Sequence, residues 1–227
     1  MNPLEGILPV NKEKGRTAFY LVKVLRKLSG IKKIGHAGTL DPFATGVMVM
    51  LVGRPYTKIS DKFIHHDKEY IATAKLGAST TTHDCDGQVT ELSSKVPTLK
   101  EIEEVLLQFQ GQIEQVPPMY SAKKVDGQKL YVLARKGIEI ERKPIQVHVE
   151  VKLLDYSYPH LKFEVKCSKG TYIRSIAYDV GQKLQSEAHL IELIRSRSGP
   201  YTLKDCIDAK SLSDPSFDWT PYIRKET

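Results

Sequence analysis

The segment from Gly35 to Gly46 holds the residue types best suited to chemistry: three glycines, a histidine and an Asp-Pro pair in one short stretch. It directly precedes an apolar run, Val47–Val52, which has the length and β-branching of a buried strand. Glycines let a backbone approach a ligand closely, and a loop anchored by a strand holds a carboxylate such as Asp41 in a defined geometry. The alternative is structural, with Asp41 capping a helix that begins at Pro42. The pattern alone favours neither interpretation.

Other familiar signatures are missing or incomplete. The sequence has no glycine-rich phosphate loop of the form G-x-x-x-x-G-K-[ST] or G-x-G-x-x-G. The run Asp84-Cys85-Asp86-Gly87 is similar to a calcium loop, but Thr82 and Ser93 stand where ligating carboxylates belong, so a structural turn is favoured. Two histidine-containing runs, His65-His66-Asp67 and His189-Leu190-Ile191-Glu192, lack a third converging ligand. We therefore expect no metal site.

Positive charge is concentrated in two parts of the chain, which carries 34 Lys and Arg against 27 Asp and Glu, a net charge of +7. The first cluster comprises Lys12, Lys14, Arg16, Lys23, Arg26, Lys27, Lys32 and Lys33, with the single acid Glu13 among them. The second comprises Lys123, Lys124, Lys129, Arg135, Lys136, Arg142 and Lys143. Such clusters attract nucleic-acid phosphates, but a basic surface also serves solubility alone. Charge by itself leaves both open.

Composition predicts a globular protein of the reducing cytoplasm. The 227 residues are 41% hydrophobic and 27% charged, which excludes disordered and collagen-like chains. The longest wholly apolar run is Val47–Val52, far short of the roughly 18 residues of a membrane span, and the N-terminal residues lack the apolar stretch of a signal peptide. The three cysteines have no C-x-x-C spacing, so we expect free thiols.

Hydrophobic periodicity predicts how the chain positions these residues. We expect strands at Ile7–Val10, Val47–Val52, Glu69–Leu76, Ile145–Leu153, Leu161–Cys167 and His189–Ile194. We expect helices at Thr17–Ser29, from Thr98 to Gly111, at Gln128–Lys136 and at Thr171–Leu184. Strands and helices do not alternate regularly, which is typical of an α+β fold with a mixed, largely antiparallel sheet flanked by helices.

The Gly35–Gly46 segment resembles the catalytic motif of TruB-type tRNA pseudouridine synthases, in the form Gly-His-Ala-Gly-Thr-Leu-Asp-Pro-x-Ala-Thr-Gly. Four further landmarks of that family follow in order: Glu69-Tyr70, Asp84-x-Asp86-Gly87, Pro117–Ala122 and Lys169–Arg174. The resemblance extends from about Gly6 to Arg197. It implies the pseudouridine synthase fold, with a catalytic domain over residues 1–198. Residues 199–227 would form a short tail, the family's usual PUA-like domain being absent or vestigial.

The resemblance also implies a reaction and a substrate. TruB-type enzymes convert uridine 55 in the TΨC loop of tRNA to pseudouridine by flipping the base out, breaking the bond from ribose C1′ to N1 and remaking it to C5. They use no cofactor or metal, and the family expectation is a monomer that does not associate with membranes. On the same resemblance, the basic clusters would hold the T arm of tRNA by its phosphates.

Site residues follow from the resemblance position by position. Asp41 would be the catalytic carboxylate, acting at C1′ or on the proton at C2′. The other implied residues all contact the substrate or the carboxylate. Arg174 would pair with Asp41 and with Asp84, Tyr70 would stack on the uracil, Tyr172 and Leu193 would surround the base, His36 would lie against the RNA loop, and Lys12 would contact the RNA. As a strand residue, Tyr70 is equally suited to a core position.

Two other functions remain open from the sequence. A noncatalytic tRNA-binding chaperone would keep the same fold and basic surface without needing Asp41. A phosphotransferase using Asp84 and Asp86 would depend on a divalent metal ion.

Overall fold

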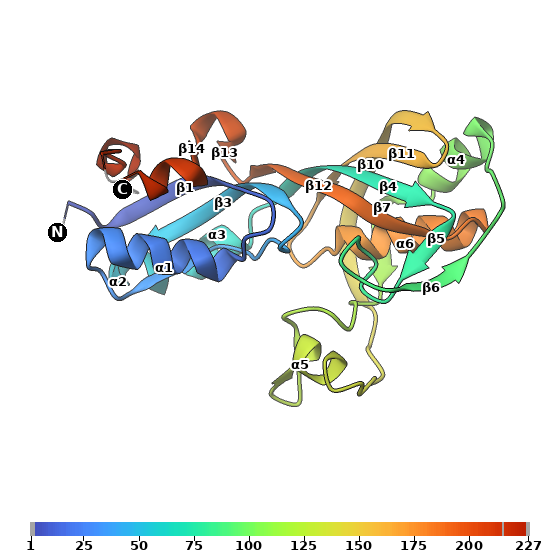
Figure 1. Ribbon diagram of the computed structural model, residues 1–227, viewed down its shortest axis with the longest axis horizontal. Coiled ribbons are helices and arrows are strands. Elements are labelled where there is room, and N and C mark those ends of the chain that lie inside the picture. The colour runs from blue at the N-terminus through green and yellow to red at the C-terminus, as the bar shows by residue number, and fades with distance from the viewer. Residues whose placement is uncertain (1–2, 215, 226–227) are drawn as a thin grey trace. The chain divides into compact units, whose positions relative to one another are not determined.

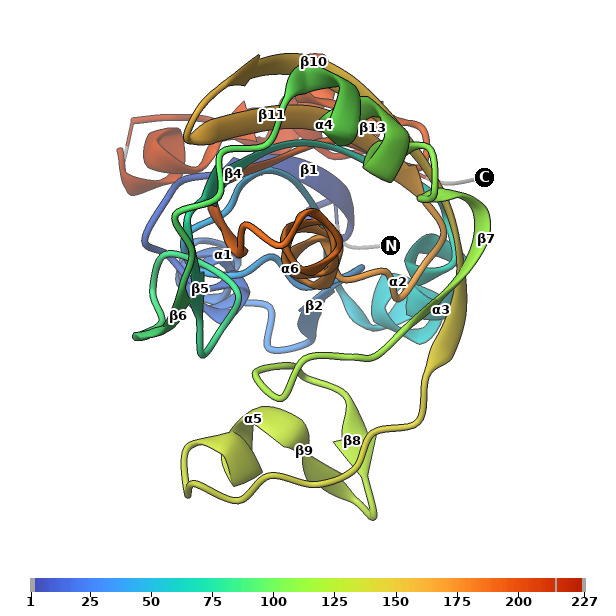
Figure 2. The ribbon, with the colours of Figure 1, turned by 90° about the vertical axis from the view of Figure 1, so that its right-hand side faces the viewer.

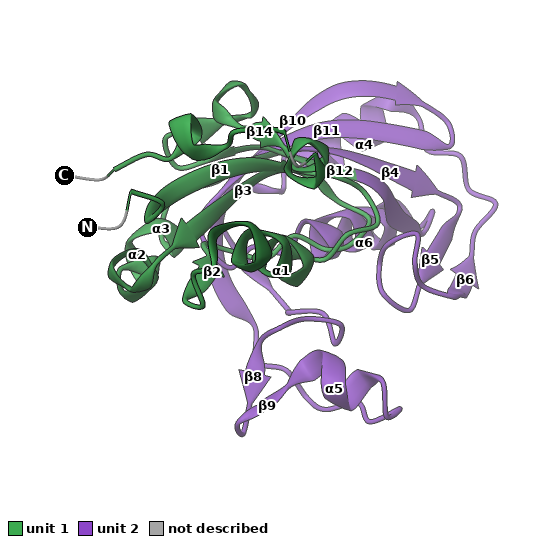
Figure 3. Cartoon of the chain, turned by 60° about the vertical axis from the view of Figure 1, so that its left-hand side comes forward, with its two compact units in different colours: residues 1–70, 193–227 green, residues 71–192 purple. Residues whose placement is uncertain are grey.

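The structure is a computed structural model that describes residues 3–214 and 216–225. The chain folds into two compact units, coloured separately in Figure 3. Unit 1 contains the described residues up to Tyr70 and from Leu193 onward, and unit 2 contains Ile71–Glu192. Two strands, β4 (Lys68–Leu76) and β12 (Ala188–Ser198), carry the chain across the boundary. The predicted α+β class is confirmed in both units, which combine helices with mostly antiparallel strands.

Unit 1 is built on strands in the order β14, β1, β3, β12. The strands of this unit are β1 (Gly6–Lys12), β2 (Ile34–His36), β3 (Thr45–Val52), β13 (Tyr201–Thr202) and β14 (Ile207–Asp208), with the first residues of β4 and the final part of β12. β1 runs antiparallel to β3 along its whole length, whereas β12 is parallel to β3, with Arg195 facing Gly46. From Gly46 to Val52, β3 is completely buried, as its apolar run predicts.

The helices of unit 1 include the one predicted over Thr17–Ser29. They are α1 (Ala18–Ser29), α2 (Arg54–Lys58) and α3 (Ser60–Ile64), followed by the 3-10 turns η1 (Leu203–Asp205), η2 (Ala209–Ser213) and η3 (Thr220–Tyr222). The hydroxyl of Thr17 caps α1 by accepting from the Tyr20 N–H, and Gly30 ends it in the left-handed conformation. Figures 1 and 3 show α1 lying along one face of the unit 1 sheet.

Unit 2 is an antiparallel sheet that curves around one helix. Its strands are the second part of β4, then β5 (Ala78–Thr80), β6 (Val89–Leu92), β7 (Gln110–Gln115), β8 (Lys124–Val125), β9 (Gln128–Lys129), β10 (Ile145–Ser157), β11 (His160–Cys167) and the first part of β12. Its helices are α4 (Leu99–Leu106), α5 (Leu130–Ala134) and α6 (Ile173–Leu184). The sheet order is β4, β11, β10, β7, and Figure 2 shows these strands wrapping around α6. Ile173, Ile176, Val180 and Leu184 of α6 are buried there.

Between β7 and β10 the chain leaves the sheet of unit 2 to form a small lobe that carries β8, β9 and α5 (Figure 2). The lobe contains the second basic cluster, and most of the cationic side chains in it are exposed. Two of them lie close to the ring of Tyr131, with Lys129 Nζ 5.6 Å and the Arg135 guanidinium 5.4 Å from its centroid. A basic surface with an aromatic ring in it is suited to contacts with nucleic acid.

Two predicted helices were wrong in extent. The helix expected from Thr98 to Gly111 ends at Leu106, because Gln110–Gln115 pairs with β10 as strand β7. The helix expected over Gln128–Lys136 covers only Leu130–Ala134. No helix in residues 3–214 or 216–225 is long and apolar enough to cross a membrane.

Candidate active site

Asp41 begins a tight turn that leads directly into β3. Its backbone carbonyl accepts a hydrogen bond from the Ala44 N–H at 3.1 Å, which closes the turn over Pro42 and Phe43. Strand β3 then starts at Thr45. The helix-capping alternative for Asp41 is therefore wrong, since no helix begins at Pro42. The carboxylate sits on a short loop that is anchored at its C-terminal end by a fully buried strand.

Lys12 supports this turn through hydrogen bonds to the backbone. Its side chain is completely buried, and its ammonium donates to the carbonyls of Glu13 at 2.9 Å, Arg16 at 2.7 Å and Pro42 at 3.1 Å. These bonds use all three ammonium hydrogens, so the structure gives Lys12 a supporting role in place of the RNA contact that the resemblance implies. Burial lowers the pKa of Lys12 from 10.5 to about 8, while the nearby charge of Asp41 acts in the opposite direction.

Arg195, which no sequence motif singles out, also binds the backbone of this loop. Only 1% of this arginine is exposed. Its Nε donates to the carbonyl of Val47 at 2.6 Å, Nη1 to Thr39 at 3.3 Å, and Nη2 to Gly38 at 3.2 Å and to the Met48 sulfur at 3.1 Å. The guanidinium therefore ties together the residues before and after Asp41. One signal in the sequence could have found it: Arg195 follows Leu193 by two positions at the end of a predicted strand, so both side chains lie on the same face of that strand.

Gly46 allows β12 to come this close to β3. It adopts a φ of +108°, and a Cβ placed there would fall on the backbone of Arg195. A larger residue would be strained in conformation and would also collide with β12. Gly46, the third glycine of the motif, thus permits the contact between β3 and β12 that places Arg195 beside the loop of Asp41.

His36 ends β2, within the same unit as Asp41. Burial, and then the positive charge of Arg195, lower the pKa of His36 from 6.5. Its Nδ1 is buried and has no hydrogen-bond partner among the described residues. A neutral imidazole at pH 7 can donate one hydrogen bond to a nucleobase and accept another from it, but it carries no charge that would attract a phosphate.

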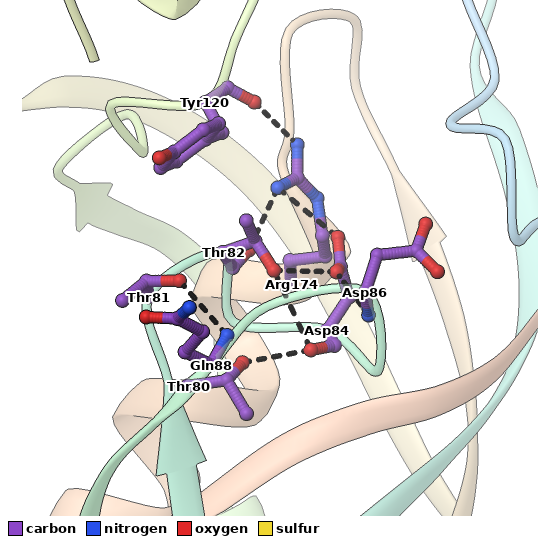
Figure 4. A network of polar contacts seen from close by, with 8 residues as sticks. All are labelled: Thr80, Thr81, Thr82, Asp84, Asp86, Gln88, Tyr120 and Arg174. Carbon is purple, nitrogen blue, oxygen red and sulfur yellow. Dashed lines mark hydrogen bonds and ion pairs between the residues drawn. The ribbon is translucent and has the colours of Figure 1, made fainter. Parts of the chain in front are cut away.

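In unit 2, Arg174 and Asp84 form the centre of a polar network (Figure 4). Arg174 Nη1 lies 3.3 Å from Asp84 Oδ2, with both side chains almost completely buried. The guanidinium also donates to the carbonyls of Thr82 at 2.7 Å and Tyr120 at 2.8 Å. Asp84 Oδ1 accepts from the Thr82 hydroxyl at 2.5 Å and from the Asp86 N–H at 3.0 Å. The expected contact between Asp84 and Arg174 is confirmed.

This network has two consequences. It connects the Thr82–Asp86 turn, helix α6 and the start of the basic lobe, because Tyr120 belongs to the lobe. It also occupies the Asp84 carboxylate with a guanidinium, so a divalent ion bound there would have to displace Arg174. The geometry suits the positioning of a guanidinium better than metal ligation.

The remaining predicted residues are divided between the two units. Tyr70 and Leu193, 8% and 6% exposed, belong to β4 and β12 in unit 1. Tyr172 precedes α6 in unit 2, where its backbone N–H donates to Gln115 Oε1 at 2.7 Å and its carbonyl accepts from Gln115 Nε2 at 3.0 Å. The roles of these side chains around a flipped base, and the pairing of Asp41 with Arg174, stay predictions.

His83 lies inside the turn that carries Asp84 and stacks on Tyr178, with ring centroids 4.0 Å apart and planes at 4°. Its backbone has a φ of +60°. Burial, and then the charges of Arg174 and Arg142, lower the pKa of His83 from 6.5 to about 4. The imidazole is therefore neutral in the folded protein near neutral pH.

This shift predicts acid sensitivity. Between pH 6.5 and 4 the unfolded chain protonates His83 and the folded chain does not, so folding stability falls as the pH is lowered through that range. By pH 5 the loss attributable to this residue is about 2 kcal/mol. In urea unfolding at pH 7 and pH 5, His83→Phe should lose less stability on acidification than the wild type.

The matched control is His160→Gln, which alters an exposed histidine of β11. It should keep the pH dependence of the wild type. An unchanged acid loss in His83→Phe would contradict the assignment.

Comparisons with known proteins agree with the motifs. The model of the family described as TruB family pseudouridylate synthase (N terminal domain) matches residues 26–173. Proteins named tRNA pseudouridine synthase B are similar over most of the chain. The one from Protochlamydia amoebophila is 60% identical over 92% of this chain and 80% of its own length, and the one from Chlamydia muridarum is 56% identical over 98% and 92%.

Solved structures share the fold. A chain in the crystal structure of a Cbf5-Nop10-Gar1 complex matches with a TM-score of 0.75 at 24% identity, covering 99% of this chain and 61% of that one. A chain in the structure of an H/ACA RNP bound to a substrate RNA containing 2′-deoxyuridine matches with a TM-score of 0.69 at 23% identity, covering 98% and 59%. The predicted fold is confirmed at this level.

Proposed function

Because the chain belongs to the TruB family of pseudouridylate synthases, we propose that it converts uridine 55 in the TΨC loop of tRNA to pseudouridine, with Asp41 as the catalytic carboxylate. The observation that carries the proposal is the support given to Asp41. Its turn is held by two buried cations, Lys12 and Arg195, which donate to main-chain carbonyls on both sides of Asp41 in the sequence: Pro42 after it, and Thr39 and Gly38 before it.

The chemistry needs one well-placed carboxylate. The bond from ribose C1′ to N1 of uracil must break, and the released uracil must turn and bond to C1′ through C5. Uracil spreads the negative charge of the leaving group over its two carbonyls, so no second acid is needed to protonate it, unlike the leaving oxygen of a glycoside. The proton on C5 then leaves and N1 regains one, so the product is an isomer of the substrate.

Asp41 can serve this exchange in two ways. As a nucleophile, its carboxylate bonds to C1′ as N1 leaves and is displaced by C5 in the second step. As a base, it removes the proton from C2′, which gives a glycal and free uracil, and returns the proton when C5 adds to C1′. Both routes place the carboxylate next to the ribose and need the base turned out of its stack.

The other residues would hold the base and the RNA. Arg174, kept in place by Asp84, would pair with Asp41 and keep the carboxylate ionised. Tyr70 would stack on the uracil, Tyr172 and Leu193 would enclose it, and His36 would hydrogen-bond to the RNA loop. The basic lobe would bind the T-arm phosphates.

The test is pseudouridine formation on an unmodified tRNA transcript, in buffer containing EDTA, mapped by carbodiimide labelling and primer extension. We expect one new stop, in the T loop, and none on a transcript in which uridine 55 is replaced by cytidine. Absence of the stop would refute the proposal. A stop elsewhere would refute the substrate position, and a stop that EDTA removes would point to metal-dependent chemistry.

A further inference from the structure

Helix α1 has an exposed face that stabilisation of the fold does not account for. Its buried residues are Ala18, Leu21, Val22 and Leu25. Outside this buried stripe, Phe19 is 52% exposed, although a phenylalanine is usually buried. Lys23 Nζ lies 5.4 Å from the centroid of the Phe19 ring and the Arg26 guanidinium lies 6.0 Å from it. One turn earlier, the Arg16 guanidinium covers the ring of Tyr20 at 4.6 Å.

The charged side chains of α1 itself are all positive. The twelve residues of α1 include no acid. Arg16 has a partner, Glu13, at 3.5 Å, but Lys23 and Arg26 form no ion pair with any described residue. Two cations without counter-ions beside an exposed aromatic ring offer stacking and phosphate neutralisation at the same place.

The surface is hollowed at the start of the helix. A pocket of about 260 Å³ is lined by Gly15, Arg16, Thr17, Phe19, Tyr20 and Lys23. This is less than the roughly 300–1,000 Å³ of a site for a drug-sized ligand, so a single planar base suits it better than a larger molecule.

The pocket is joined to the loop of Asp41. The Gly15 N–H donates to the Pro42 carbonyl at 2.8 Å, and the Lys12 ammonium bridges the carbonyls of Arg16 and Pro42. Gly15 and Arg16, which line the pocket, are therefore linked through hydrogen bonds to Pro42, the residue that follows Asp41. A polynucleotide whose target uridine lies at Asp41 would have its neighbouring nucleotides close to α1.

We propose that Arg16, Phe19, Tyr20, Lys23 and Arg26 form a second RNA contact, the α1 RNA face, which binds an unpaired T-arm nucleotide near the target uridine. Its base stacks on Phe19, and its flanking phosphates pair with Lys23 and Arg26. This inference rests on the proposed function, because the occupant is part of the same substrate. Stacking tolerates any base, so the face contributes affinity and placement without reading sequence.

The test measures binding of an unmodified T-arm hairpin by fluorescence anisotropy over a series of salt concentrations. Phe19→Leu keeps an apolar side chain but removes the ring, and we expect it to weaken binding about 5- to 10-fold at every salt concentration. The double variant Lys23→Gln, Arg26→Gln should reduce the slope of log K against log salt by about 2, since each phosphate contact contributes about 0.9.

The matched control is Arg54→Gln, Lys58→Gln, which removes two exposed cations four residues apart on α2. It should leave both the affinity and the salt slope close to those of the wild type. Circular dichroism and melting temperatures would show that all variants are folded.

Three results would overturn the proposal. Wild-type affinity in both Phe19→Leu and the double variant would show that the α1 RNA face does not contribute to RNA binding. A loss in the double variant without one in Phe19→Leu would mean that the face attracts anions without stacking a base. A loss seen with whole tRNA but not with the hairpin would place the occupant outside the T arm. If the wild type forms no pseudouridine, the proposed function fails, and that assay does not involve the α1 variants.

Discussion

Replacing Asp41 with asparagine is expected to reduce pseudouridine formation by about 10⁴-fold or more while tRNA binding persists. Asparagine has nearly the same shape and is accepted at the first position of a turn, so the bond from the Ala44 N–H to the carbonyl of residue 41 can be kept. An amide is a poor nucleophile and a poor base, so neither the attack on C1′ nor the removal of the C2′ proton can proceed as it does with the carboxylate. The measurement is the single-turnover rate on the tRNA transcript, together with the dissociation constant.

Asp61→Asn is the control for this prediction, because Asp61 is an exposed acid on α3 of the same unit. It should retain the wild-type rate. Activity that survives in Asp41→Asn would exclude Asp41 as the catalytic carboxylate. Tight tRNA binding by a wild type that never forms pseudouridine would instead favour the noncatalytic chaperone.

Replacing Arg195 with lysine is expected to slow the single-turnover rate at saturating RNA by about 10- to 100-fold, with less than about a threefold change in the dissociation constant. Lysine keeps the charge, but it lacks the planar fork that reaches Gly38, Thr39 and Val47 together. The loop of Asp41 would then sample positions away from the ribose, and small misplacements of a reacting group cost large factors in rate. Arg195 acts in this prediction as a positioning residue.

The separation of rate from binding distinguishes positioning from simple support of the fold. The rate is to be measured well below the melting temperature of the variant, where a purely structural defect leaves it unchanged. Arg197→Lys is the control, because Arg197 lies two residues further along β12 and pairs with Glu69 at 2.8 Å. Arg195→Met should fail to fold stably, since several buried carbonyls lose their donor at about 1–3 kcal/mol each. A wild-type rate in folded Arg195→Lys would contradict the positioning role.

Local signals in the sequence were sufficient for the regular elements around the site. Thr17 and Gly30 delimit α1, and the capping box of Thr98 and Glu101 starts α4, because a cap satisfies backbone groups within a few residues. The alternation of buried residues in β4 was equally readable, since opposite faces of a strand meet different environments. The family motif could be recognised on the same grounds, from contiguous residue types.

Strand β7 is an element that local sequence signals do not predict. Gln110–Gln115 alternates weakly and follows a helix, and it becomes a strand through its register with β10, where Ile113 faces Val147. That pairing joins residues 30 to 40 positions apart in the sequence, so no short window contains it.

The sequence by itself determined the family, the α+β class, the segment that carries Asp41 and the main helices, because each depends on residues close together in the chain. Only the tertiary structure decided what holds that segment. Lys12 and Arg195 are charged, and charge alone predicts exposure, yet both are buried because backbone carbonyls converge on them. The carbonyls that Arg195 binds lie about 150 residues away in the sequence, and they meet it only because β12 packs beside β3 at Gly46.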